Sequence, residues 1–121
     1  MDLKLSEEHR MIRDMARDFA QKEIAPIAAE LDVEARFPTK TVKKMGELGL
    51  LGMMVPPSMG GAGAGAVSYC LALQEIAYAC ASSAVTMSVA NLSTEPLLKF
   101  GTNEQKGKWL NKLAAGSLLG A

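Results

Sequence analysis

The sequence predicts an all-α protein, a helical bundle of about five or six helices in one domain spanning residues 1–121. Three observations predict this class. Apolar residues recur at the three- and four-residue intervals of an α-helix, and hydroxyl, proline and glycine signals bound the periodic segments. No segment alternates apolar and polar residues as a half-buried strand would, and alanine, leucine and methionine, which favour helices, are plentiful.

The first helix is predicted to begin after Ser6, whose hydroxyl can cap it and which precedes two glutamates suited to the positive end of the helix dipole. Its apolar positions repeat at helical spacing as far as Ile24. Pro26 lacks an amide hydrogen and crowds the preceding turn, so it must end or kink the helix. Because the apolar stripe continues at Ile27 and Leu31, the sequence favours a kink.

The next segment is predicted to be a short helix followed by irregular chain. The helix opens at Pro38-Thr39 and closes at Gly49, a residue suited to the left-handed conformation. The apolar run 50–55 is expected to be extended, because residues before proline avoid the helical region and Pro56 follows. The four glycines within residues 58–65 predict a loop.

The second half of the chain is predicted to form the remaining helices. One covers residues 66–80, and Ser82-Ser83 interrupts it and caps another over residues 84–92. Thr94-Glu95-Pro96 is a start signal for a short helix that ends at Gly101.

The last helix is predicted from a capping box and a glycine stop. Thr102 and Gln105 have the spacing of that box, and Gly116 marks the end. Trp109, Leu110 and Leu113 are expected to give this helix its buried side.

Charge balance excludes some classes of partner. Thirteen basic and thirteen acidic side chains leave no net charge to attract nucleic acid or an anionic membrane. The charge-free stretch 76–94 has nearly the length of a membrane span, but it holds seven serine, threonine and asparagine residues, so we expect a buried helix and no membrane span.

Cysteine usage and the N-terminus predict a cytoplasmic protein. Cys70 and Cys80 are ten residues apart in a predicted helix, a separation of roughly 15 Å that a disulfide cannot bridge. We therefore expect both to be reduced core residues. Asp2 and Lys4 follow the initiator with no apolar stretch behind them, so no secretory signal or transit peptide is expected.

Few residues are candidates for chemistry. The glycine-rich segment 60–65 lies between an apolar run and a helix, as in dinucleotide-binding turns, but Pro56-Pro57 separates the run from the glycines and no second strand follows. Nucleotide binding by this loop stays a minor alternative. His9, the single histidine, is expected to be solvated. Glu75 is expected to be a capping or paired structural carboxylate, with a catalytic base as the alternative. No metal site is expected.

Several segments along nearly the whole chain together form a recognisable set. They are residues 5–13 (Leu5-Ser6-Glu7-Glu8-His9-Arg10-Met11-Ile12-Arg13), residues 23–30, Glu47-Leu48-Gly49-Leu50-Leu51-Gly52, Gly60-Gly61-Ala62-Gly63, Glu75-Ile76-Ala77, Met87-Ser88-Val89 and residues 100–106. In their order and spacing these segments resemble the acyl-CoA dehydrogenase family. Each segment is a weak signal by itself, whereas the set together is strong.

The resemblance implies an oxidoreductase that binds FAD and oxidises the α,β-bond of an acyl-CoA to the enoyl-CoA, as in fatty acid metabolism. It implies electron transfer to an electron-transferring flavoprotein, a parent homotetramer and, in a eukaryote, a location in the mitochondrial matrix. Residues 1–121 would be the N-terminal helical domain, ending before the flavin-binding β-domain and the catalytic glutamate. No catalytic or cofactor-binding residue is therefore assigned, and the 121-residue chain alone is expected to be colourless and inactive.

The resemblance also implies a substrate contact. The helix equivalent to residues 84–92 helps to line the acyl-chain cavity in this family, so Val85, Ser88, Val89 and Leu92 are candidate wall residues. The pattern Thr86-Met87-Ser88-Val89 resembles short-chain members, and the predicted substrate is a short- or branched-chain acyl-CoA. An alternative is a non-enzymatic helical interaction module on the same scaffold.

Overall fold

The computed structural model describes residues 4–120, so the prediction that involves Asp2 lies partly outside the described residues. All regular elements within this range are helical and no strand occurs among them, which confirms the all-α class. The elements are α1 (Glu7–Phe19), a π-helical turn (Ala20–Ile24), α2 (Ala25–Val33), α3 (Thr39–Glu47), a 3-10 turn (Pro57–Met59), α4 (Gly65–Ala79), α5 (Ala81–Phe100) and α6 (Asn103–Ala114).

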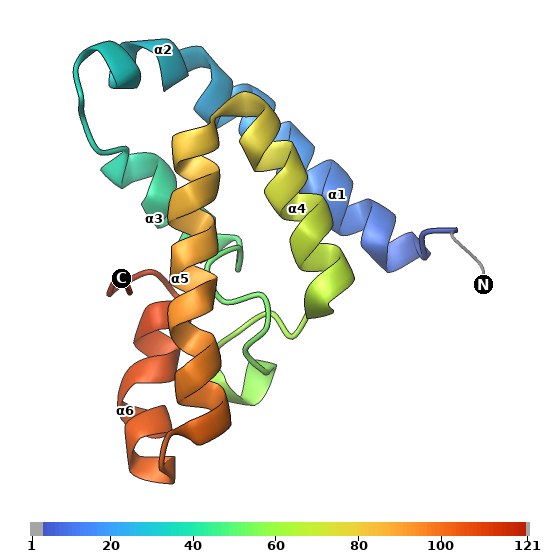
Figure 1. Ribbon diagram of the computed structural model, residues 1–121. Helices are drawn as coiled ribbons and strands as arrows, with labels where there is room; N and C mark the ends of the chain where they lie inside the picture. Colours follow the sequence, from blue (N-terminus) through green and yellow to red (C-terminus); the bar gives the residue numbers. More distant parts are fainter. Residues whose placement is uncertain (1–3, 121) are drawn as a thin grey trace.

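Helices α4 and α5 form the centre of the molecule and run side by side in opposite directions (Figure 1). Only Cys80 separates them, and its extended backbone, with φ −162° and ψ 112°, reverses the chain. Helix α1 packs against α4, while α3 and α6 pack against α5. Within the described residues, no helix is both long enough and apolar enough to cross a bilayer.

The main core lies between α1, α3, α4, α5 and the segment that precedes the glycine loop. It is built from medium-sized and small apolar side chains, which lets the helices approach closely. The fully buried larger members are Ile24, Met45, Leu50, Leu51, Met53, Ile76 and Met87. A second, smaller cluster, Val55, Leu110 and Ala114, holds α6 to the same segment.

The chain stays helical through Pro26, as the continuing apolar stripe predicts. The irregularity lies in the π-helical turn Ala20–Ile24 just before it. This turn puts Pro26 in the first turn of α2, where a missing amide hydrogen disturbs the hydrogen-bond ladder least.

Residues 50–55 are not extended, which corrects the sequence prediction. They form a series of turns, and their apolar side chains are almost all buried. The helix before them ends at Glu47 and is closed, as predicted, by Gly49, whose φ is +77°. The Leu50 amide donates to the Met45 carbonyl and the Gly49 amide to the Gly46 carbonyl. Turns are possible here because the side chain of Asn91, from α5, forms hydrogen bonds with the buried main chain of Leu50 and Met53.

Helix α5 is one continuous helix of 20 residues, where the sequence predicted two. The break from α4 comes at Cys80 and not at Ser82-Ser83. Thr94 does not cap a new helix: it is fully buried, and its hydroxyl donates to the Asn91 carbonyl at 2.7 Å. Pro96 lies inside α5. An unbroken buried stripe through Met87, Asn91 and Thr94 outweighs the local start signal.

Two further predictions are partly wrong. The capping box of α6 is present, with reciprocal bonds between Thr102 and Gln105, and Leu110 is fully buried. Trp109, however, is 39% exposed, and the Lys108 ammonium lies 4.8 Å from the centre of its ring. Both cysteines are free thiols, but Cys70 is exposed and does not belong to the core.

Candidate functional site on helix α5

The four candidate wall residues lie on one face of α5, because their spacing of three, four and seven residues matches the helical repeat. None of them belongs to the buried core. Val85 is 61% exposed and Leu92 is 66% exposed, while Ser88 and Val89 are half-buried. The structure therefore brings the four residues together as a mostly apolar surface that is partly exposed.

The opposite face of α5 fixes the position of this wall. That face is buried and carries a polar anchor, the side-chain amide of Asn91. Its Nδ2 donates to the Leu50 carbonyl at 2.8 Å and to the Met87 carbonyl at 2.9 Å, and its Oδ1 accepts from the Met53 amide at 2.8 Å. Sequence reasoning missed this role, although an asparagine in a charge-free predicted buried helix needs buried partners.

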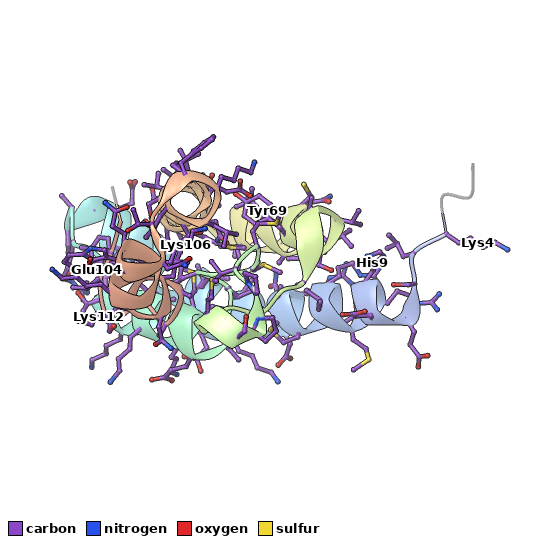
Figure 2. All side chains as sticks on the ribbon, turned by 90° about the horizontal axis from the view of Figure 1, so that it is seen from below. Lys4, His9, Tyr69, Glu104, Lys106 and Lys112 are labelled. Carbon is purple, nitrogen blue, oxygen red and sulfur yellow. The ribbon has the colours of Figure 1, made fainter. Side chains whose placement is uncertain are left out.

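Ser88 is the one polar side chain of the four. Its Oγ accepts a hydrogen bond of 3.2 Å from the hydroxyl of Tyr69, which comes from α4. Figure 2 shows Tyr69 on the part of α4 that lies next to α5. Tyr69 is partly buried and packs against the main core. The sequence offered no separate signal for this pairing, because Tyr69 and Ser88 are 19 residues apart.

Two hollows of the described surface lie elsewhere. The larger, about 630 Å³, lies between α2, the connection to α3 and the start of α5, and its lining includes Leu31, Phe37 and Ser83. The smaller, about 330 Å³, lies between α1 and α4 around Arg17 and Tyr78. Neither hollow is lined by a candidate wall residue. In this chain the face is an open wall and not a closed cavity.

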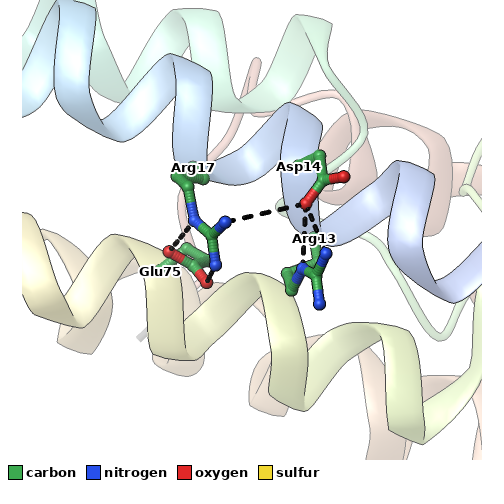
Figure 3. A network of polar contacts seen from close by, with 4 residues as sticks. All are labelled: Arg13, Asp14, Arg17 and Glu75. Carbon is green, nitrogen blue, oxygen red and sulfur yellow. Dashed lines mark hydrogen bonds and ion pairs between the residues drawn. The ribbon is translucent and has the colours of Figure 1, made fainter. Parts of the chain in front are cut away.

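Glu75 forms a salt bridge with Arg17 across α1 and α4 (Figure 3). The Arg17 Nε and Nη2 atoms donate to the two carboxylate oxygens at 3.1 and 2.8 Å. This hydrogen bonding and the charge of Glu75 raise the pKa of Arg17. The Glu75 side chain is only 15% exposed. A carboxylate held at both oxygens by a guanidinium is a structural partner, so the prediction of a paired carboxylate is confirmed.

The glycine loop does not present its backbone to a ligand. The amides of residues 60–64 all donate to carbonyls of the protein itself, those of Gly52, Met53, Val55, Pro56 and Pro57. A dinucleotide-binding turn needs such amides free to meet a pyrophosphate. Nucleotide binding by this loop is therefore not supported, and the loop instead closes over the buried turns before it.

Residues 6–117 match the family model described as the N-terminal domain of acyl-CoA dehydrogenase. The chain belongs to the acyl-CoA dehydrogenase family. It is 51% identical over 119 residues to the mitochondrial short-chain specific acyl-CoA dehydrogenase of Rattus norvegicus. The matched residues make up 98% of this chain and 29% of that protein. The chain thus spans less than a third of the length of this relative.

Solved structures of acyl-CoA dehydrogenases share the fold. Butyryl-CoA dehydrogenase from Megasphaera elsdenii superimposes with a TM-score of 0.90 at 32% identity, over 98% of this chain and 32% of that one. An acyl-CoA dehydrogenase from Bacillus anthracis, complexed with FAD, gives 0.88 at 35% identity, over 96% of this chain and 20% of that one. The helical arrangement described above is therefore that of the acyl-CoA dehydrogenase N-terminal domain.

Proposed function

We propose that this chain, residues 1–121, serves as the N-terminal helical domain of an FAD-dependent dehydrogenase that oxidises the α,β-bond of a short- or branched-chain acyl-CoA to the enoyl-CoA. The observation that carries the proposal is the partly exposed wall of α5, with three apolar side chains and one hydroxyl that already has a protein partner. The relatives named above act as acyl-CoA dehydrogenases, and two of them are named for short acyl groups.

In this proposal the residues of α5 bind the acyl chain and exclude water from it. Val85, Val89 and Leu92 offer aliphatic surface, and covering this surface with a hydrocarbon chain is favourable by about 25 cal/mol per Å². The buried face and the Asn91 anchor hold the wall in one position, so that its side chains limit the space for the acyl group.

FAD, when bound, would accept the two hydrogens removed from the substrate. The glycine loop does not fit a flavin cradle, because the amides of residues 60–64 bond within the protein. We therefore assign no cofactor-binding and no catalytic residue to this chain, and derive no step through the flavin. The proposal also includes an electron-transferring flavoprotein as acceptor, a homotetrameric parent, and a cytoplasmic or mitochondrial-matrix location.

The test uses the complete product of the reading frame that encodes these residues. We expect the purified product to carry one flavin per chain, with visible absorbance that bleaches on addition of butyryl-CoA and bleaches less with palmitoyl-CoA. The 121-residue chain expressed alone should be colourless. A colourless, acyl-CoA-insensitive complete product would contradict the proposal and favour the non-enzymatic interaction module.

The wall itself is tested by Val85→Glu, which puts a charge on the proposed acyl surface. We expect at least a tenfold loss in kcat/KM for butyryl-CoA, because the carboxylate must lose water when the acyl group binds. Val33→Glu is the matched control, since Val33 is an exposed valine on α2 and does not line the hollow between α2 and α5. Equal activity of the two variants would show that Val85 does not contact substrate.

A further inference from the structure

The hydroxyl of Ser88 is exceptional among the bonded hydroxyls of α5. Those of Thr86, Ser93 and Thr94 each donate to a main-chain carbonyl of α5 itself. Ser88 instead bonds across the helix interface, where its Oγ accepts from Tyr69 of α4. Its side chain is therefore drawn toward α4 by a group outside its own helix.

This bond has a consequence if the wall is covered. Ser88 lies between Val85, Val89 and Leu92, so an acyl chain that covers these residues also removes water from the serine hydroxyl. A buried hydroxyl without a partner is unfavourable, whereas one that keeps a protein hydrogen bond is tolerated. Tyr69 can supply that bond in the absence of water, because its ring is held against the main core.

We propose that Tyr69 is a positioning residue for substrate binding: its hydroxyl bond at 3.2 Å holds the Ser88 hydroxyl toward α4, so that α5 presents an apolar wall to the acyl chain. This inference rests on the proposed function. It assigns to Tyr69 no contact with the reacting atoms. Tyr69 affects acyl-chain binding and not the chemical step. Loss of its hydroxyl should therefore raise KM and the dissociation constant while kcat stays unchanged.

The test is a double-mutant cycle in the complete reading-frame product, with butyryl-CoA and hexanoyl-CoA as probes. Tyr69→Phe keeps the ring and removes the hydroxyl. We expect it to weaken acyl-CoA binding by about three- to tenfold, the loss expected when one buried hydroxyl loses its partner at the long end of hydrogen-bond distances. In a Ser88→Ala background the same change should alter binding by less than twofold, since no hydroxyl is left unpaired.

Tyr78→Phe is the matched control, because Tyr78 is a tyrosine of the same helix that is 85% exposed and lines the hollow beside Arg17. It should leave binding unchanged. Thermal unfolding of each variant separates a folding defect from a binding defect. The Ser88→Ala background removes the acceptor of the hydrogen bond, whereas Tyr69→Phe removes its donor.

Three outcomes decide the matter. Weakening by Tyr69→Phe that disappears in the Ser88→Ala background supports the inference. Equal weakening in both backgrounds, or none in either, overturns it while leaving the proposed function intact. A wild-type product that binds flavin but binds neither butyryl-CoA nor hexanoyl-CoA overturns both this inference and the proposed function.

Discussion

The Oδ1 atom of Asn91 accepts a hydrogen bond of 2.8 Å from the main-chain amide of Met53, so that one side chain of α5 holds the buried turns that precede the glycine loop. The Nδ2 atom of the same Asn91 side chain donates to the Leu50 carbonyl. We expect Asn91→Ala to lower the free energy of unfolding by roughly 2–4 kcal/mol, because it leaves buried backbone groups without partners. Urea unfolding followed by far-ultraviolet circular dichroism measures this.

The control for Asn91 is Asn111→Ala, which changes an exposed asparagine of α6. Its unfolding free energy should stay within about 0.5 kcal/mol of the wild type. Similar losses for both substitutions would mean that the Asn91 bonds add little to stability.

Gly46 and Gly107 provide a second matched pair. A Cβ on Gly46 would overlap the main-chain carbonyl of Ala115, where α3 meets the end of α6. Gly46→Ala should therefore lower stability by at least about 2 kcal/mol, since backbone must move. Nothing lies near a Cβ on Gly107, which is in the middle of α6, so Gly107→Ala should raise stability by about 0.5–1 kcal/mol. Thermal unfolding should give shifts of opposite sign.

Ala35 has a left-handed backbone with φ 50°, a conformation that favours glycine. It lies just past α2, where the Arg36 amide bonds to the Leu31 carbonyl as in a glycine-terminated helix. We expect Ala35→Gly to stabilise the protein by about 0.5–1 kcal/mol. Ala29→Gly, at an exposed position inside α2, should instead destabilise it by about 1 kcal/mol. A loss of stability in both variants would contradict this.

The capping box at α6 leads to a fourth prediction. The Thr102 hydroxyl accepts from the Gln105 amide at 3.2 Å, and the Gln105 side chain accepts from the Thr102 amide at 2.9 Å. Thr102→Ala should cost about 1 kcal/mol of unfolding free energy. Thr39, at the start of α3, makes no capping bond with its side chain, so Thr39→Ala should have a much smaller effect in the same urea titration.

The sequence predicted best those features that depend on neighbouring residues. The caps at Ser6 and Thr102, the left-handed Gly49 and the helical path through Pro26 each depend on residues close in sequence. Such signals predict where a helix begins or ends when nothing distant competes with them.

The errors came where distant contacts decide. Thr94 and Pro96 carry a start signal, yet α5 continues through both because Thr94 is buried within a long stripe. Residues 50–55 form turns because Asn91, about forty residues later, satisfies their backbone. On the candidate wall, helical spacing placed Val85, Ser88, Val89 and Leu92 on one face, whereas the partner of Ser88 could be found only in three dimensions.

The turns at residues 50–55 also connect the glycine loop to α5. Main-chain amides of the loop donate hydrogen bonds to these turns on one side, and the Asn91 side chain bonds to them on the other. A change in the length of that loop would pull on the middle of α5 and displace the surface that Val85 and Leu92 present. Homologous proteins could therefore alter the space beside this helix by insertions or deletions far from it, with every residue of the helix unchanged.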